Sequence, residues 1–178
     1  MNNKPISCLL FFVSTMIFAG CSLPAYHEPD SGERARLRVS VRNGGTNLVG
    51  VDVLPDGTCA STQVADFRHI ATLNGSVPNG GWQGVRIGIP DGGGFTDVQL
   101  AEVAVAADKS ISLEFSSSSL NWFCRVPFAF TPKSGSDYEA VYSVGNSRCR
   151  VDLTRIRRDD DGAYARVPIE TQKLTACR

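Results

Sequence analysis

The fold is decided by the stretch ARLRVSVR at residues 35–42, in which apolar and polar side chains alternate without interruption. One set is Ala35, Leu37, Val39 and Val41, and the other is Arg36, Arg38, Ser40 and Arg42. A period of two is typical of a β-strand with one face buried and the other turned outward. We therefore predict a half-buried strand over residues 35–42.

Further strands follow from the same pattern along the rest of the chain. Short apolar runs separated by turn residues predict eight more strands, over residues 49–53, 85–89, 98–106, 111–115, 122–130, 138–144, 148–156 and 163–169. Residues 64–73 are the one candidate for a short helix. Strands at this spacing predict an all-β domain, an antiparallel β-sandwich of eight or nine strands of immunoglobulin-like or transthyretin-like type.

Length and charge limit the classes of protein that fit. The chain has 178 residues, which suits one domain with a tail. Its 18 Lys and Arg balance its 18 Asp and Glu, so no net positive potential favours nucleic acid, and we expect no nucleic-acid partner. The apolar fraction of 42% is too high for a disordered chain.

The first twenty residues have the three parts of a secretory signal. Lys4 supplies the positive charge, and residues 9–19 form an apolar run about half as long as a membrane-spanning helix. We therefore predict export from the cytoplasm.

The end of this signal resembles the lipobox of bacterial lipoprotein precursors. The residues that carry the likeness are Phe18-Ala19-Gly20-Cys21, with Phe18 where the family usually has Leu. The resemblance implies cleavage before Cys21, a lipid on its thiol and attachment to a membrane. Ser22 after the cysteine implies the outer membrane, facing either the periplasm or the exterior. Cleavage by an ordinary signal peptidase, leaving a free thiol at Cys21, is the alternative.

These predictions divide the chain into three parts. Residues 1–20 are the signal peptide, and residues 21–34 are the lipidated cysteine with a flexible tether that has two prolines and no periodicity. Residues 35–178 are the sandwich domain.

The cysteines fit two disulfides in an exported domain. Of the six in the chain, Cys8 leaves with the signal and Cys21 carries the lipid. Cys124 and Cys149 both point toward the core of one β-meander, so we predict that they pair. Cys59 and Cys177 then form the second bridge, which ties the C-terminus to a loop.

No catalytic or metal site is predicted. Asp66 and His69 lack a nucleophile motif. No pair for glycosidase chemistry can be identified among Glu102, Glu114, Glu139 and Glu170. Residues 159–162 (Asp-Asp-Asp-Gly) lack the ligand spacing of a calcium loop and are interpreted as an exposed hairpin turn. We expect no cofactor.

Binding is the remaining class of function. Arg36, Arg38 and Arg42 form one outward basic stripe and Arg148 and Arg150 another, which together suit phosphates, peptidoglycan carboxylates or the acidic face of an envelope protein. Trp82, between glycines, is a further candidate for an exposed contact.

The sequence therefore favours a lipid-anchored cell-envelope protein with a non-enzymatic binding or assembly role. Its size and build resemble the small sandwich lipoproteins of type VI secretion machines, which gives an accessory secretion role as one alternative. Residues 134–138 (Ser-Gly-Ser-Asp-Tyr) resemble the loop of membrane-bound lysozyme inhibitors, which gives inhibition of lysozyme as another.

Overall fold

The computed structural model describes residues 24–42, 47–55, 59–60, 66–77, 80–145 and 148–176. Nine strands have five or more residues: β1 (Arg34–Arg42), β2 (Val49–Val53), β4 (Arg68–Leu73), β5 (Leu100–Ala106), β6 (Ile111–Ser119), β7 (Trp122–Phe130), β8 (Asp137–Gly145), β9 (Arg148–Arg158) and β10 (Tyr164–Pro168). Three more have two residues each: β3 (Cys59–Ala60), β11 (Gln172–Lys173) and β12 (Thr175–Ala176). A 3₁₀ turn, η2 (Asp97–Gln99), precedes β5.

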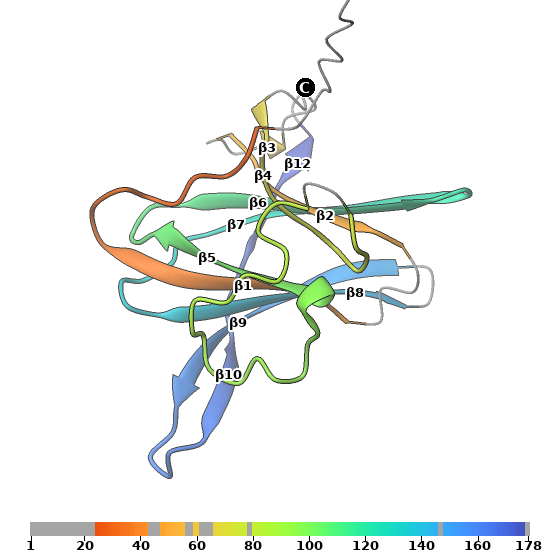
Figure 1. Ribbon diagram of the computed structural model, residues 1–178. Helices are drawn as coiled ribbons and strands as arrows, with labels where there is room; N and C mark the ends of the chain where they lie inside the picture. The colour runs from red at the N-terminus through yellow and green to blue at the C-terminus, as the bar shows by residue number, and fades with distance from the viewer. Residues whose placement is uncertain are drawn as a thin grey trace, which may run out of the picture.

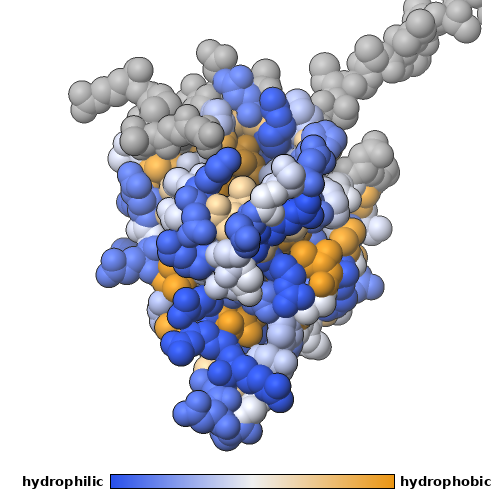
Figure 2. Space-filling model, turned by 90° about the vertical axis from the view of Figure 1, so that its left-hand side faces the viewer, coloured by the Kyte–Doolittle hydropathy of each residue, from blue (hydrophilic) through white to orange (hydrophobic). Residues whose placement is uncertain are grey.

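The long strands form two stacked sheets, which confirms the predicted all-β sandwich (Figure 1). Sheet A has the order β11-β7-β6-β2-β4, and sheet B has the order β10-β9-β8-β1-β5. Within them every pair is antiparallel except β1 with β8, which run parallel. Strands β9 and β10 extend below the sandwich as a hairpin, whose surface is largely hydrophilic (Figure 2).

The core lies between the two sheets, where the apolar set of β1 meets sheet A. Leu37, Val39 and Val41 are fully buried there. Aromatic rings fill the space on the β6–β8 side, with the ring centroids of Phe115 and Tyr142 5.9 Å apart. Alternation therefore predicted correctly which face of β1 enters the core.

A second layer of packing covers part of the outer face of sheet B. The covering loop, residues 85–95, crosses this face in front of β1 (Figure 1). Beneath it the guanidinium of Arg38 is 0% exposed. It donates to Glu102 Oε1 at 2.9 Å, to Glu139 Oε1 at 2.8 Å and to the carbonyl of Ile89 at 2.5 Å.

The strand predicted over residues 85–89 is wrong, because the Arg38 cluster imposes another conformation there. The amides of Ile87, Gly88 and Ile89 all donate to Glu102 Oε2, at 2.7, 3.0 and 3.2 Å. Successive amides of a strand point to opposite sides, so three in a row cannot converge on one oxygen in a strand. Gly88 makes the convergence feasible with a φ of +89°.

Close approach of the covering loop also needs a residue without a side chain at position 92. A Cβ atom on Gly92 would lie 2.6 Å from Nη2 of Arg38. Glycine therefore lets the backbone pass directly over the buried guanidinium.

The helix considered over residues 64–73 is also wrong, since residues 68–73 form β4 and residues 64–65 lie outside the described parts. A β-bulge beside Val51 and Asp52 inserts Ile70 into β4, so Ile70 and Ala71 are both buried. The extra residue breaks the alternation, and Phe67, Ile70 and Ala71 then have the spacing of a helix face.

The two long sides of the sandwich are closed differently. On the β7–β9 side the predicted disulfide Cys124–Cys149 joins sheet A to sheet B, with the two Cα atoms 6.4 Å apart. On the β4–β5 side the N-terminal strap, residues 24–28, joins the two edge strands.

For residues 24–28, the strap corrects the prediction of a flexible tether over residues 21–34, of which residues 21–23 lie outside the described part of the chain. The amide of His69 in β4 donates to the carbonyl of Pro24, and the amide of Tyr26 donates back to His69, both at 2.8 Å. Tyr26 Oη donates to the carbonyl of Ala104 in β5 at 2.9 Å, and burial raises the pKa of Tyr26 to about 12. The sequence has no periodicity here because the strap contributes single anchoring contacts rather than a strand.

The pairing of β3 with β12 brings together the two segments that the second predicted disulfide would join. Cys59 pairs with Thr175 and Ala60 with Ala176, one residue before Cys177, which lies outside the described residues. We predict a Cys59–Cys177 disulfide, seen as a linked peptide in mass spectrometry of a non-reduced digest. Alkylation of both thiols in the unreduced protein would contradict it.

Candidate functional site

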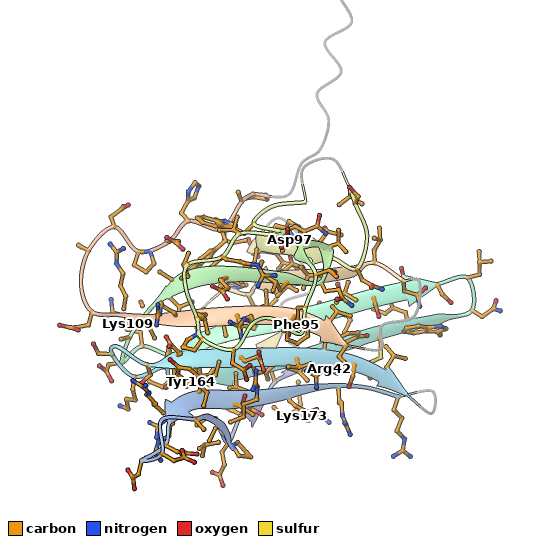
Figure 3. All side chains as sticks on the ribbon, turned by 60° about the horizontal axis from the view of Figure 1, so that its bottom comes forward. Arg42, Phe95, Asp97, Lys109, Tyr164 and Lys173 are labelled. Atoms are coloured by element: carbon orange, nitrogen blue, oxygen red, sulfur yellow. A yellow bond between two sulfur atoms is a disulfide. The ribbon has the colours of Figure 1, made fainter. Side chains whose placement is uncertain are left out.

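An open groove lies on the part of the outer face of sheet B that the covering loop leaves free (Figure 3). Its volume is about 970 Å³. Its charged and hydroxyl side chains are Arg42, Glu139, Ser143, Arg148, Arg150, Asp152, Thr154 and Arg166. We call it the arginine groove, because four of these side chains are guanidinium groups.

Strand register places the groove residues in rows across the sheet. Arg42 of β1 pairs with Ser143 of β8, which pairs with Arg150 of β9. This row brings together two arginines that are 108 positions apart in the chain. Arg148 lies at the start of β9, two residues from Arg150, and therefore on the same face.

At the inner end of the groove the charges are already compensated. Glu139, which is 1% exposed, accepts from Arg166 Nε at 2.6 Å as well as from Arg38. Arg166 also donates to Asp91 of the covering loop at 2.6 Å. The hydrogen bonds with these two carboxylates raise the pKa of Arg166, so it stays charged, but its hydrogen-bonding groups are largely occupied.

At the outer end the arginines are open to solvent. Arg42 lies over the ring of Phe95, 5.3 Å from the centroid, and the two are neighbours in Figure 3. Arg150 has an ion pair with Asp152 at 3.1 Å, although its side chain is 74% exposed. A cation stacked on one ring face keeps its N–H groups free to donate from its edge.

This arrangement suits an anionic ligand. Arginine forks bind carboxylate and phosphate groups by paired hydrogen bonds, and an exposed row of them selects for negative charge. The groove is too open to exclude water, so an extended partner fits it better than an enclosed small molecule.

Only one of the three arginines predicted on β1 lines the groove. All three share the outer face, but Arg38 is buried and Arg36 lies under the covering loop. Arg36 makes a two-pronged ion pair with Asp137 at 2.7 and 2.8 Å. Arg38 therefore offers no surface for a partner, and its role is to hold the loop.

Trp82 is half-buried rather than an exposed contact. Its ring packs against the core, and its indole Nε1 donates to the carbonyl of Tyr26 at 3.3 Å. Trp82 therefore supports the N-terminal strap. The predicted lipid carrier, Cys21, lies outside the described residues.

Among the residues that sequence reasoning missed are Arg166, which lines the groove, and Phe95, whose ring lies beneath Arg42. Phe95 follows a run of glycines, and nothing in its surroundings indicates a ring beneath a cation. Arg166 shares one face of β10 with Tyr164 and Pro168, but its partner Glu139 is distant in sequence. Alternation could have assigned its face, but not its partner.

His69 has a different partner from the one considered in the sequence. Its Nδ1 lies 2.8 Å from Asp52 Oδ1, and its Nε2 lies 3.1 Å from Thr72 Oγ1. Asp66 does not take part in these contacts. The β-bulge in β4 allows His69 and Thr72 to share the outer face of sheet A.

Two of the glutamates weighed for glycosidase chemistry do come together, but around a cation. Glu102 and Glu139 both bind Arg38, and each is 1% exposed. The guanidinium between the two buried carboxylates supplies a positive charge and a hydrogen-bond donor to each of them. They present no pair of free carboxyl groups to a sugar.

The two loops singled out in the sequence have structural contacts. In residues 134–138 the Ser134 hydroxyl donates to Glu33, and Tyr138 is buried in the core. Tyr138 is therefore closed to an outside partner, whereas Ser134 is exposed and bonded to Glu33. In the turn between β9 and β10, the amide of Gly162 donates to the carbonyl of Asp159, as expected of a hairpin turn.

No family model matches the chain, and no curated protein matches its sequence. In the described residues no helix is long and apolar enough to cross a membrane.

Protonation of Glu139 should weaken the fold at acid pH. Burial raises the pKa of its carboxyl. The hydrogen bonds from Arg166 and Arg38 lower the pKa by more than burial raises it, so the pKa lies below the ordinary value of 4.5. The stabilisation is therefore present above that ordinary value and is lost as the pH falls through the folded-state pKa. We predict that E139Q is less stable than the unaltered protein at pH 7, and that the difference shrinks below pH 4.5.

Urea unfolding of both proteins in steps from pH 7 to pH 3 measures this difference, with the exposed Glu170→Gln as control. A difference that stays constant over the whole range would contradict the assignment.

Proposed function

We propose that this protein is a lipid-anchored component of the bacterial cell envelope, held at the outer membrane through Cys21. Its role is binding or assembly rather than catalysis, and the arginine groove is its contact site for an anionic partner. The groups that fit are the carboxylates of peptidoglycan and the acidic face of an envelope protein.

The observation that carries the binding role is the row formed by Arg42 and Arg150. Two exposed guanidinium groups are held on the sheet with one strand, β8, between them, and the groove around them is open to solvent. Exposed ion pairs contribute little to stability, so the fold itself does not require this row. A cationic row without a structural role supports a role in recognition.

The strap supports an anchor close to the domain. Pro24 is bonded to β4 and follows Cys21 by only three positions, a span of at most about 11 Å. A lipid on Cys21 would therefore hold the domain against the membrane surface. Two or three acyl chains anchor stably, since each buried methylene contributes about 0.8 kcal/mol.

The anchor is tested by a Cys21→Ser variant. The unaltered protein should fractionate with the outer membrane and resist extraction by carbonate, and its N-terminal peptide should have the mass of a lipidated cysteine. C21S should be lost from that fraction. A C21S protein that remains in the outer membrane would contradict the proposal.

The groove is tested by reversing the charge of its exposed row. R42E/R150E should lose binding to purified peptidoglycan sacculi in sedimentation, or to its protein partner in capture from detergent-solubilised envelopes. Binding of the unaltered protein should weaken with added salt. The matched control is R157E, an exposed arginine on the β9–β10 hairpin. Equal capture by R42E/R150E and the unaltered protein in both assays would remove the groove as the contact site.

A further inference from the structure

Large apolar side chains are exposed at one end of sheet A. Leu120 is 102% exposed, Phe123 is 64% exposed and Leu48 is 45% exposed. Leu120 lies in the turn between β6 and β7, and Phe123 is the second residue of β7. Leu48 and Phe123 also line one small cavity of about 260 Å³ on the outer face of sheet A. We call these three residues, with Trp122, the apolar tip.

The apolar tip is held rigidly although it is exposed. Strands β6 and β7 stay paired up to Ser119 and Trp122, which leaves only two residues in the turn. Cys124, one residue beyond Phe123, is bridged to β9. The hairpin extends beyond the neighbouring strands at this end of the sandwich (Figure 1). An exposed leucine at the apex of a rigid hairpin gains nothing for the fold and costs hydration free energy.

The chain enters the domain on the same sheet. Pro24, the first described residue, is bonded to His69 of β4, and the row of paired residues through His69 reaches β7 at Pro127. Phe123 lies four residues from Pro127, which is about 13 Å along the strand, and β7 lies three strand spacings from β4, which is about 14 Å across the sheet. The two distances combine to about 20 Å between Phe123 and His69. Cys21 is within about 11 Å of Pro24.

We infer that the apolar tip is a second membrane contact, which inserts into the surface of the bilayer to which Cys21 anchors the chain. This inference rests on the proposed lipid anchor. Leu120, Trp122 and Phe123 are the residue types that enter the boundary between headgroups and acyl chains. The short link to Cys21 keeps the tip within reach of the same membrane plane.

A lipid surface fits the tip better than a protein does. A protein partner would need a pocket shaped to a convex apex, whereas a bilayer accepts such an apex without a preformed shape. The length of the chain before Pro24, with its apolar run and Cys21, also places a membrane near sheet A. The opposite end of the molecule, seen in Figure 2, is mostly hydrophilic with separate apolar spots.

This contact orients the whole domain. With sheet A held to the bilayer at the strap and at the apolar tip, the outer face of sheet B is turned away from it, since the two sheets are stacked. The arginine groove is then presented to partners in the aqueous space.

Tryptophan fluorescence tests the contact, because the chain has only two tryptophans. The full-length protein is reconstituted into vesicles of phosphatidylethanolamine and phosphatidylglycerol, with or without brominated acyl chains, which quench a tryptophan that reaches them. A Trp122→Phe protein, with Trp82 as the only emitter, gives the baseline. We expect quenching of the unaltered protein above this baseline, and loss of that excess in L120N/F123N. Tyr164→Asn, an exposed apolar residue on the β9–β10 hairpin, is the matched control and should keep the full quenching.

Flotation of the same vesicles separates this inference from the proposed anchor. Protein that floats but shows no quenching above the baseline would overturn the tip contact and leave the anchor unaffected. Finding that an envelope protein, instead of lipid, covers the tip would have the same consequence. Protein that does not float would overturn both. Quenching that survives in L120N/F123N would overturn the assignment to these residues.

Discussion

The structure depends on one buried guanidinium, that of Arg38. A charge removed from water costs several kcal/mol unless it is fully paired and hydrogen-bonded. Here Glu102, Glu139 and two backbone carbonyls surround it, and each carboxylate is held by other donors in turn. Removing one member would leave the others buried with part of their charge and hydrogen bonds uncompensated, so the cluster forms as a unit.

This cluster decides how the outer face of sheet B is used. Because Arg38 lies in the middle of β1, the covering loop is drawn over one part of the face, and the part toward Arg42 stays open. Arginines of one strand therefore have two different roles. Arg38 stabilises the fold, and Arg42 is left for a partner.

The two long sides of the sandwich are closed by different covalent or hydrogen-bonded links between sheet A and sheet B. A disulfide holds the sheets together on the β7–β9 side and stiffens the hairpin whose apex is apolar. The N-terminal strap holds them on the β4–β5 side, and it brings the start of the chain against sheet A. Both devices leave sheet B as the face available for recognition in the proposed orientation.

Much of the fold could be predicted from the sequence, because burial of one strand face leaves a period of two. The strand around Val39 and the Cys124–Cys149 bridge followed from that pattern alone. Alternation fails where something other than a strand partner binds the backbone, as at Gly88, or where a bulge adds a residue, as at Ile70. It also assigns a side chain to a face without saying what lies above that face.

The same limit applies to the candidate site. The sequence placed Arg36, Arg38 and Arg42 together on an outer face, and the structure confirms that they share it. The sequence could not show that a loop from a distant part of the chain buries Arg38 and accepts a hydrogen bond from Arg36. Nor could it show the strap, since Tyr26 and Pro24 act through single hydrogen bonds that leave no periodic signal.

The central claim, that the Arg38 cluster locks the covering loop onto sheet B, is tested most directly by amide hydrogen exchange measured by NMR. We predict that the amides of Ile87, Gly88 and Ile89 exchange as slowly as those of β5, although they belong to no strand, because each donates to a buried carboxylate oxygen. Exchange of these three amides at the rate of an open loop would contradict it.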